Sequence, residues 1–599
     1  MCGIIGYYGQ HPASKILIDG LKRLEYRGYD SSGLCLVEDN KLVCYKQAGP
    51  VTYLEGAIAH QDLKGHIGIA HTRWATHGAP NEINAHPHFD CHHQIAIVHN
   101  GIIENYQALK QLLSSEGHVF TSETDSEVLA HLIEKFYTGS LEEAVIKALA
   151  LIEGSYGLVA LHVNENKLVA ARRSSPLVIG IGQGETFIAS DVPAILNHTK
   201  DVVYLEDGDL AIIDEGGYQI KNLAGEPLDR RVEEVKLNID QIEKKGYKHF
   251  MLKEIFEQPQ SLVNVLAGRI TNNQIKLSLN WHREAIERII IAACGTSWHS
   301  ALIGKYLLEE IVGLPVEVDY ASEFRYRHPL VGNHDLFIAI SQSGETADTL
   351  AALREAKSRG AQSLGIVNVV GSTVAREVDS GIYLHAGPEI GVASTKAFTA
   401  QITALLLLAF YWRQEMGHKI DDSVINELQH LPAVVEETLK ANNQVKELAQ
   451  RFMNFEHFLY LGRGLNFPVA LEGALKLKEI SYIHAEGYPA AEIKHGPIAL
   501  IDNNMPVVVL ATKNDLSDKI LSNIQEIKAR GGQVIAVVDQ DYESVEQLAD
   551  YLVIVPAVHV WCSPIVNVIP LQLLAYYIAD AKGLDVDKPR NLAKSVTVE

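Results

Sequence analysis

Short apolar runs bounded by polar residues dominate the first third of the chain. Four runs have the length and composition of β-strands, and they lie at residues 67–70, 95–98, 157–162 and 167–171. Residues 14–24 and 126–136 instead repeat apolar side chains at the spacing of an amphipathic helix. Strands before and after helices predict a layered α+β or sandwich domain. We expect it to end near Val232, close to the start of a polar, charged stretch.

From about residue 285 the pattern changes to alternating strands and helices, which predicts parallel sheets with crossover helices. Strands are expected at residues 288–293, 336–340, 458–461 and 507–511. The segment that starts at 336 lines up with the one that starts at 507, without a gap, through a whole strand-helix-strand unit. We therefore predict two similar α/β lobes. The alternative is that the two segments align only because all strand-helix units have similar sequence patterns, without an internal repeat.

Composition narrows the class of partner. The chain has 599 residues, which predicts about three to five domains. A formal net charge of −22 argues against nucleic acid or an anionic membrane as the main partner. The apolar run at 402–412 is shorter than the roughly 20 residues of a spanning helix, so we interpret it as a buried helix.

The six cysteines are scattered without a CxxC pair, which is typical of reduced thiols in a cytosolic protein. The start of the chain also lacks the basic region and long apolar core of a signal peptide. Both observations predict a cytoplasmic location.

Cys2 is the first candidate for chemistry. Removal of Met1 would leave a thiol and a free α-amine on one residue. An α-amine has a pKa of roughly 7.7–8.0, so near neutral pH it can act as the general base for the thiol. The alternative is that Cys2 is a buried or incidental cysteine, and for Cys2 taken alone this interpretation is favoured over a nucleophile.

Two polar clusters directly follow predicted strands. The first, residues 71–78, contains Arg73, which could grip a carboxylate through two parallel hydrogen bonds or could be a surface arginine in a salt bridge. The second contains Asn100 and Gly101. An Asn amide and a Gly N–H can form an oxyanion hole, whereas the dipeptide alone favours a hairpin turn.

Two further clusters leave alternatives open. Residues 122–126 precede a helix, so they are typical of an N-cap, and Asp125 could also bind the α-ammonium group of an amino acid. A group of histidines and a cysteine suggests zinc: His86, His88, Cys91, His92 and His93. Because adjacent histidines on a strand point apart and the spacing matches no zinc finger, we expect no metal there.

These clusters together resemble the class II glutamine amidotransferases, which are N-terminal-nucleophile hydrolases with an αββα sandwich. The resemblance covers about residues 1–235 and rests on five motifs in family order: Cys2-Gly3-Ile4, Arg27-Gly28-Tyr29-Asp30-Ser31, HTRWATHG at 71–78, HNG at 99–101 and ETDSE at 123–127. It implies Cys2 as nucleophile, with Asn100 and Gly101 as the oxyanion hole. It implies a glutamine-binding set of Arg73, Thr76, His77 and Asp125.

Hydroxyl groups gather at a strand end of the first lobe. Ser341, Ser343 and Thr346 stand at a strand-to-helix turn, where hydroxyls and free N–H groups suit a phosphate. An N-capping cluster is the alternative. Thr296 and Ser297 follow another strand, and strand ends are where parallel sheets bind ligands. The second lobe has Lys513, Asn514 and Asp515 at the matching turn, so we expect it to lack the site.

A third segment, the predicted helix 471–482, places Glu472, Lys476 and Glu479 on one face. A solvated ion pair is the plain alternative to an acid–base role. The last residues, from Lys588 onward, end with alternating apolar side chains, so this tail could dock rather than fray.

The second half is similar to the doubly wound, parallel-sheet sugar isomerase (SIS) lobes of amidotransferases that aminate fructose 6-phosphate. The resemblance rests on CGTS at 294–297, SQSGET at 341–346, EIGVASTKAF at 389–398, EGALKLKEISY at 472–482, EIKHGP at 492–497 and the tail DKPRNLAKSVTVE. It implies a sugar-phosphate site of Thr296, Ser297, Ser341, Gln342, Ser343, Thr346, Val392 and Ser394.

The same resemblance implies the catalytic roles. Lys594 forms a Schiff base with the ketose, Glu479 moves the proton between C1 and C2, and Lys476 stabilises the enolate. His495 opens the sugar ring, from a neighbouring subunit, and Trp74 gates an ammonia channel. The implied reaction uses glutamine and fructose 6-phosphate, yields glutamate and glucosamine 6-phosphate, and needs no metal, nicotinamide or pyridoxal.

The implied organisation is a multidomain α/β and α+β protein that forms a homodimer. We expect an amidotransferase domain at 2–236, a linker at 237–250, SIS lobes at 251–430 and 431–590, and a closing tail at 591–599. Two alternatives remain. One is an amidotransferase for a different sugar phosphate or a phosphoribosyl group, and the other is a sugar-phosphate sensor without catalysis.

Overall fold

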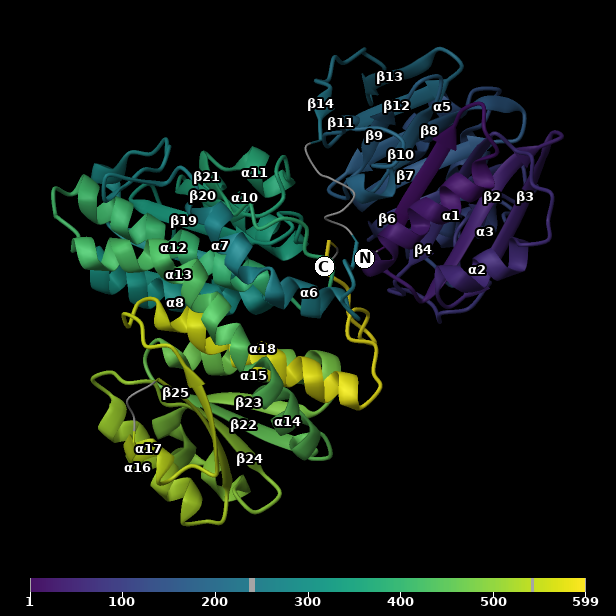
Figure 1. Ribbon diagram of the computed structural model, residues 1–599. Coiled ribbons are helices and arrows are strands. Elements are labelled where there is room, and N and C mark those ends of the chain that lie inside the picture. The colour runs from purple at the N-terminus through teal and green to yellow at the C-terminus, as the bar shows by residue number, and fades with distance from the viewer. Residues whose placement is uncertain (1, 236–242, 540–542, 598–599) are drawn as a thin grey trace. The chain divides into compact units, whose positions relative to one another are not determined.

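The computed structural model describes residues 2–235, 243–539 and 543–597 (Figure 1). The chain forms two compact units. The first comprises Met1–Ile242 with Ala593–Glu599, and the second comprises Glu243–Leu592. Part of the predicted linker, residues 237–242, and the last two residues of the predicted tail lie outside the described residues.

Two antiparallel sheets form the centre of the first unit. The eight-stranded sheet has the order β14-β11-β9-β10-β1-β4-β2-β3, and the six-stranded sheet has the order β13-β12-β8-β7-β6-β5. The strands of the larger sheet are β1 (Gly3–Tyr8), β2 (Ser31–Glu38), β3 (Lys41–Ala48), β4 (Ile67–Arg73), β9 (Val178–Ile181), β10 (Thr186–Ala189), β11 (Asp201–Tyr204) and β14 (Glu233–Glu234). Those of the smaller are β5 (His88–Phe89), β6 (Ile95–Ile103), β7 (Gly154–His162), β8 (Glu165–Arg173), β12 (Asp209–Asp214) and β13 (Gly217–Asn222).

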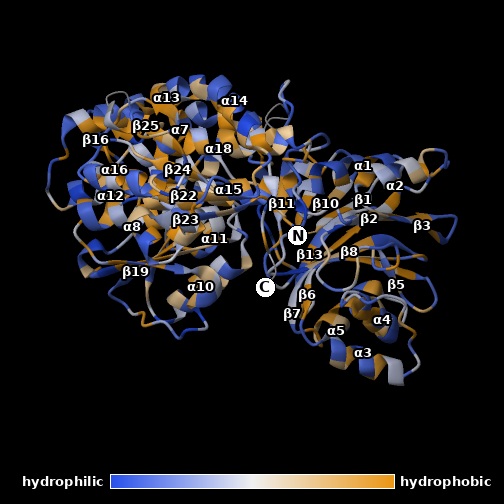
Figure 2. Cartoon of the chain, turned by 90° about the horizontal axis from the view of Figure 1, so that it is seen from below, coloured by the Kyte–Doolittle hydropathy of each residue, from blue (hydrophilic) through white to orange (hydrophobic). Residues whose placement is uncertain are grey.

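Helices cover the outer face of each sheet. They are α1 (Ala13–Leu24), α2 (Val51–Ile58), α3 (Tyr106–Ser115), α4 (Glu127–Phe136) and α5 (Leu141–Leu149). Successive residues of β1 show the layering, because side chains alternate across a strand. Ile4 packs between the sheets, whereas Ile5 packs beneath α1 and α2. Helices α3, α4 and α5 cover the other sheet and carry both hydrophobic and hydrophilic residues (Figure 2). The predicted αββα sandwich is confirmed.

The four strands predicted in this unit are β4, β6, β7 and β8, and the two predicted helices are α1 and α4. The sequence analysis missed α2, α3 and α5. Helix α3 buries only Leu109 and Leu113 among its ten residues, so its apolar pattern is too sparse to stand out.

The expectation that all six cysteines are reduced is wrong, because Cys35 and Cys44 form a disulfide. Strands β2 and β3 pair these two residues directly opposite each other, with their Cα atoms 4.2 Å apart. Directly opposed residues of an antiparallel pair bring their Cβ atoms close together. The two cysteines are nine positions apart in the sequence, in no familiar motif. The thiols therefore no longer argue for a cytoplasmic location.

The second unit contains two five-stranded parallel sheets with the orders β18-β17-β19-β20-β21 and β23-β22-β24-β25-β26. Numbered within each lobe, the two orders are the same, which confirms the predicted repeat. The strands are β17 (Arg288–Ala293), β18 (Val316–Tyr320), β19 (Asp335–Ser341), β20 (Gln362–Val367), β21 (Ser380–Tyr383), β22 (His457–Gly462), β23 (His484–Pro489), β24 (Pro506–Leu510), β25 (Gln533–Asp539) and β26 (Tyr551–Val555), with a small hairpin of β15 (Ile270–Thr271) and β16 (Gln274–Ile275).

Helices pack on both faces of each parallel sheet, as expected for doubly wound lobes. The larger helices are α7 (Gln258–Leu266), α8 (Gly295–Ile311), α10 (Ala347–Ser358), α12 (Lys396–Glu415), α13 (Asp422–Thr438), α14 (Asn442–Phe452), α15 (Asn466–Ser481), α16 (Ser517–Lys528) and α18 (Ser563–Ala581). The shorter ones are α6 (Phe250–Phe256), α9 (Ala321–Phe324), α11 (Thr373–Glu377) and α17 (Glu543–Glu546). In β17, Ile290 packs toward α10 and Ile291 toward α8 and α12.

One hydrophobic core joins the two lobes, since it contains side chains from the sheets and helices of both. Helix α13 packs against α7 and also against α18. The expected boundary between residues 430 and 431 falls inside this helix.

Helix α18 is long and apolar enough to cross a membrane by length and composition, but 89% of its 18-residue apolar stretch is buried inside the protein. A core helix of a soluble protein passes the same test. The predicted buried helix at 402–412 is confirmed as part of α12.

Candidate active sites

Cys2 lies at the start of β1, where it meets the end of β4. The Trp74 N–H donates to Cys2 Sγ at 3.3 Å, and the Sγ lies 3.6 Å from the Trp74 carbonyl oxygen. The Cys2 carbonyl oxygen accepts from Asn100 Nδ2 at 3.0 Å and from Arg27 Nε at 3.2 Å. The structure thus brings together Cys2, Trp74 and Asn100, three predicted site residues that stand far apart in the sequence.

The surroundings of Cys2 act on its protonation in opposite directions. Burial raises the pKa of the thiol, while the Trp74 N–H and the Arg73 and Arg27 guanidinium groups act to lower it. The net pKa lies above that of a free cysteine. A thiol in this setting needs a general base to become a nucleophile. Met1, whose removal would supply that base, lies outside the described residues.

Asn100 and Gly101 lie within strand β6, paired with β7, so the hairpin-turn interpretation is wrong. His71 orients the Asn100 amide. Burial lowers the pKa of His71 to about 3, so its ring is neutral near pH 7. Its Nε2 lies 3.0 Å from Asn100 Oδ1 and 3.1 Å from the His99 carbonyl oxygen. Since both partners are acceptors, Nε2 carries the proton and donates, which turns the Asn100 Nδ2 toward Cys2.

Glycine is the residue type that fits at position 101. Its φ is +131°, and an added Cβ would stand 2.2 Å from the Ser155 carbonyl oxygen. A side chain here would force β6 away from β7. The backbone beside Asn100 is therefore held in a fixed conformation, as an oxyanion hole requires.

The four residues expected to bind glutamine occupy two segments, the end of β4 with the loop after it, and the loop before α4. Arg73 is buried, and its guanidinium donates to the carbonyl oxygens of His77, Gly78 and Ala79, so it is not a surface arginine. His77 Nδ1 lies 4.0 Å from Asp125 Oδ1, and Asp125 Oδ2 accepts the Ile103 N–H at 2.8 Å. Thr76 is exposed on the same loop.

The sequence analysis quoted three further residues only as parts of motifs. They are His71, which orients Asn100, Arg27, which bonds the Cys2 carbonyl, and Asp30, whose Oδ2 accepts the Ala75 N–H at 2.8 Å. Their membership of family motifs was the available signal. Their roles depend on partners distant in the sequence, which the sequence alone does not show.

In the second unit, hydroxyl groups converge at the end of β19. Ser341 Oγ lies 3.0 Å from Thr346 Oγ1 and 3.5 Å from Ser343 Oγ, and it accepts the Gly344 N–H at 3.0 Å. Thr346 is the N-cap residue of α10, but its hydroxyl makes no capping bond. An N-capping role thus does not explain the cluster.

Gly344 shapes this turn. It has a φ of +65°, and an added Cβ would stand 2.1 Å from Ser372 Oγ. A residue without a side chain therefore lets the turn pass close to Ser372. Gln342 lies in the same turn, where its carbonyl oxygen accepts the Asn368 N–H at 3.1 Å.

Thr296 and Ser297 start helix α8 after β17, the strand beside β19, so they lie at the same edge of the sheet. Ser297 Oγ accepts from Gln401 Nε2 at 2.9 Å. The loop before α12 carries the other two expected sugar-site residues. The Val392 N–H donates to the Asp587 carbonyl oxygen at 3.2 Å, and Ser394 Oγ donates to Glu389 Oε2 at 2.7 Å.

Lys476 is fully buried between two carboxylates, so the interpretation as a solvated ion pair is wrong. Its Nζ lies 2.8 Å from Glu479 Oε2 and 3.3 Å from Glu472 Oε1. Burial alone would lower the pKa of Lys476, but the Glu472 and Glu479 carboxylates outweigh it and raise the pKa. Lys476 also donates to Thr296 Oγ1 at 3.0 Å, which connects α15 to the first lobe.

Glu472, which contacts Lys476, and His299, which contacts Glu472, were given no role from the sequence. Glu472 is fully buried and accepts from Thr296 Oγ1 at 3.0 Å and from His299 Nδ1 at 2.7 Å. The i,i+4 spacing of Glu472 and Lys476 was the signal for the first, since it places both on one helix face. His299, on α8, offered no such signal.

The last two expected catalytic residues belong to different units. His495 is exposed at the end of a 3₁₀ turn, Ala490–His495. Lys594 belongs to the first unit, where its backbone N–H donates to the Tyr26 carbonyl oxygen at 3.4 Å. The start of the tail docks in the second unit, where the Arg590 N–H donates to Tyr482 Oη at 2.8 Å. The roles of His495 and Lys594 stay predictions.

Comparisons with known proteins identify both halves. Residues 71–197 match the glutamine amidotransferase domain family, and residues 284–411 and 452–579 match the SIS domain family. The chain is 53% identical over 615 aligned residues to a protein from Bacteroides thetaiotaomicron and 52% identical over 604 to one from Thermus thermophilus. Both alignments cover 100% of this chain and of the relative, and both relatives are named glutamine--fructose-6-phosphate aminotransferase [isomerizing].

A solved structure supports the second half. The C-terminal domain of glucosamine-fructose-6-phosphate aminotransferase from Francisella tularensis is 44% identical, with a TM-score of 0.55. It covers 58% of this chain and 100% of its own. The fold and sites define the protein as a glutamine amidotransferase joined to two SIS domains. The full-length identity goes further: the chain belongs to the family of isomerising glutamine--fructose-6-phosphate aminotransferases.

Proposed function

We propose that the protein hydrolyses glutamine and transfers the ammonia to fructose 6-phosphate, which it isomerises to glucosamine 6-phosphate. This reaction is the first step of the hexosamine pathway to UDP-N-acetylglucosamine. The observation that carries the proposal is the sequence identity of 53% and 52%, over the full length, to relatives named glutamine--fructose-6-phosphate aminotransferase [isomerizing]. The geometry supports it, because one unit presents a partly buried thiol and the other a cluster of hydroxyls beside a Lys–Glu pair.

In the first unit, we assign the attack on the glutamine amide to Cys2, with its own α-amine as base after removal of Met1. Asn100 Nδ2 and the Gly101 N–H stabilise the oxyanion that forms. Neutral His71 supports this role, because it fixes which end of the Asn100 amide faces Cys2. Arg73, Thr76, His77 and Asp125 hold the charged end of glutamine.

In the second unit, we assign the sugar phosphate to Ser341, Gln342, Ser343 and Thr346. Converging hydroxyls and the start of α10 suit an anion. The rest of the sugar lies against Thr296, Ser297, Val392 and Ser394.

The isomerisation moves one proton between C1 and C2, which requires general acid–base catalysis. We assign this transfer to Glu479. Lys476 stabilises the negative charge that develops on the sugar oxygen, since Glu472 and Glu479 keep it protonated. Lys594 forms the Schiff base, and His495 of a second subunit opens the ring.

Ammonia in water near pH 7 is mostly ammonium, which is not a nucleophile. Delivery within the protein, gated by Trp74, keeps the ammonia neutral.

We further propose that the protein is a homodimer in the cytoplasm, with no nucleic acid or membrane partner. The proposed domain limits are 2–236, 251–430 and 431–590, with a linker at 237–250 and a tail at 591–599. The net charge of −22 supports the absence of polyanionic partners.

The decisive experiment mixes the purified protein with glutamine, with and without fructose 6-phosphate, and follows glutamate and glucosamine 6-phosphate. Equal formation of both products, with faster glutamine hydrolysis when the sugar is present, is expected. Glutamate without amino sugar would point to a different acceptor. No product from the intact protein, with sugar phosphate still bound, would favour a sensor.

Two measurements on the first half-reaction sharpen this test. Cys2→Ala is expected to abolish glutamate formation, while Cys562→Ala, at a buried core thiol, is expected to retain it. Mass spectrometry of active protein is expected to show Met1 removed. Fully active protein that keeps Met1 would exclude the α-amine as base.

A further inference from the structure

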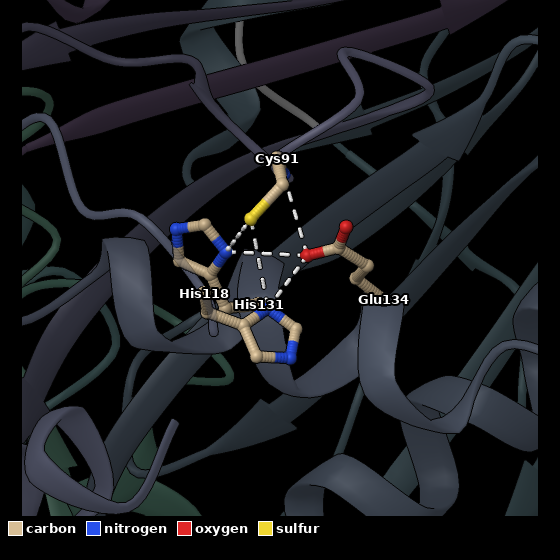
Figure 3. A group of neighbouring side chains, drawn as sticks. All are labelled: Cys91, His118, His131 and Glu134. Carbon is tan, nitrogen blue, oxygen red and sulfur yellow. Dashed lines mark hydrogen bonds and ion pairs between the residues drawn. The ribbon is translucent and has the colours of Figure 1, made fainter. Parts of the chain in front are cut away.

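Four side chains with metal-binding atoms gather at one corner of the first unit, on three separate segments (Figure 3). Cys91 lies in the turn between β5 and β6, and His118 follows α3. His131 and Glu134 are three residues apart on α4 and so share a face of the helix. This group differs from the histidine cluster considered in the sequence, of which it keeps only Cys91.

The four ligand atoms lie within 4.8 Å of one another. Cys91 Sγ lies 3.5 Å from His131 Nδ1 and 3.7 Å from His118 Nδ1. Glu134 Oε2 lies 3.3 Å from His131 Nδ1 and 2.8 Å from His118 Nδ1. In Figure 3 these atoms point toward one another.

These separations match the corners of a zinc tetrahedron. Zinc binds sulfur at about 2.3 Å and nitrogen or oxygen at about 2.0–2.1 Å, so tetrahedral angles place S and N about 3.5 Å apart and N and O about 3.3 Å apart. Of the four contacts, only His118–Glu134 is shorter than this. A shift of about half an ångström in one side chain would admit the ion.

A surrounding layer of polar groups orients the ligands. His131 Nε2 faces Glu127 Oε1 at 3.6 Å, the arrangement in which a carboxylate holds a metal-binding imidazole. The Val119 N–H donates to Cys91 Sγ at 3.4 Å, and the Cys91 N–H donates to Glu134 Oε2 at 3.3 Å. His131 is buried, with 1% of its side chain exposed, whereas neighbouring His92 is 75% exposed.

We propose that Cys91, His118, His131 and Glu134 bind a zinc ion with a structural role. Four protein ligands close the coordination shell and leave no position for a substrate, as in structural zinc sites. The ion ties the β5–β6 turn and the loop after α3 to α4. The first turn of α4 follows Asp125, so the metal stabilises the segment that carries one glutamine-binding residue.

The test uses full-length protein without a polyhistidine tag, in the Cys2→Ala background, so that the nucleophile does not bind metal. After incubation with zinc chloride and removal of excess ion by gel filtration, elemental analysis is expected to find about one zinc per chain. Cobalt chloride is expected to give the visible bands of a four-coordinate ion and a thiolate charge-transfer band in the near ultraviolet.

Matched variants separate this site from casual binding. Cys91→Ala and His118→Ala are expected to lose the zinc and the charge-transfer band, whereas His93→Ala keeps both. Glu127→Gln removes the carboxylate that faces His131 and also changes the acceptor of the Thr121 and Ser122 hydrogen bonds, and it is expected to weaken zinc about 10–100-fold. Zinc is expected to raise the melting temperature of the parent but not of Cys91→Ala.

Two results would overturn the proposal. One is a parent protein that leaves gel filtration without zinc, which would make the cluster a hydrogen-bond network alone. The other is equal zinc content in the parent and the Cys91→Ala variant. Neither result bears on the aminotransferase function, because the reaction assigned above uses none of these four residues.

Discussion

The two SIS lobes share one strand order but present different chemistry. Helix α8 of the first lobe and α15 of the second each follow the first strand of their lobe. When the two helices are aligned on residues that they share, Ala301 with Ala470 and Gly304 with Gly473, Ile303 and Leu307 of α8 stand where α15 has Glu472 and Lys476. All four side chains are buried. The same helix thus packs as apolar core in one lobe and carries a buried ion pair in the other.

At the end of the next strand, the first lobe instead carries the hydroxyl cluster and the second lobe lacks it. The first lobe has Ser341 and its neighbouring hydroxyls, whereas the second has Thr512, whose Oγ1 accepts from buried amides of Asn466 and Asn567. Its Lys513 N–H donates to both carboxylate oxygens of Asp539 at 3.0 Å. A carboxylate from the protein fills the place that an anion could take. The two copies of the repeat therefore carry different polar groups at equivalent positions, hydroxyls in one lobe and a buried Lys–Glu cluster in the other.

The largest expected effect tests the acid–base role of the second lobe. Glu479→Gln is expected to lower glucosamine 6-phosphate formation about 10²–10⁴-fold, because the proton between C1 and C2 loses its carrier. Calorimetry is expected to show that fructose 6-phosphate still binds. The control is Glu310→Gln, at the matching position of α8, where the carboxylate accepts from the Trp561 indole and activity is expected to stay unchanged. A normal rate for Glu479→Gln would remove that residue from the mechanism.

The next prediction asks whether α15 tolerates the side chain that α8 carries. Lys476→Leu copies Leu307 but leaves Glu472 and Glu479 without their shared cation. Removing one partner of a buried ion pair costs about 3–5 kcal/mol, so a clear drop in the melting temperature is expected by calorimetry. Lys478→Leu, exposed on the same helix, is expected to change little. Equal stability of Lys476→Leu and the parent would mean that the fold does not depend on this charge.

The smallest expected effect concerns the anion site. Ser341→Ala removes a hydroxyl expected to bond the phosphate, and a hydrogen bond to a charged group contributes about 1.5–3 kcal/mol. The KM for fructose 6-phosphate is therefore expected to rise about 10–100-fold. Thr512→Val, its counterpart in the second lobe, is expected to leave that KM unchanged. A similar rise in both variants would indicate that the lobes share the phosphate.

Periodicity predicted the fold well where apolar runs were long. Strand β17 was predicted with the bounds that it has, and the duplication was visible because two strand-helix-strand units align without a gap. The helices α2 and α3 were not found, since few of their residues are buried, and α5 was missed as well. Register was also out of reach, and with it the Cys35–Cys44 disulfide, because strand pairing joins residues by geometry rather than by motif.

The sites divide in the same way. Residues inside compact motifs, such as Asn100 and Ser341, were found because the type of side chain indicates the chemistry. Partners that reach the site from elsewhere were missed, as with His71 beneath Asn100 and His299 beside Glu472. The metal cluster is the extreme case. Its ligands come from three segments, and the sequence instead drew attention to adjacent histidines that do not share a site.

The core that joins the two lobes has a consequence for how this unit arose. Helix α8 contacts α15, and α12 contacts α18, so each helix meets its own counterpart in the other lobe. Contacts between equivalent surfaces are what a twofold homodimer makes. In a homodimer, both chains have the same sequence, so a residue at one position is present at the equivalent position of the second chain as well. Because both copies lie in one chain, each position of the pair is independent, and Lys476 in one copy can face a lobe that has Leu307 at the equivalent position.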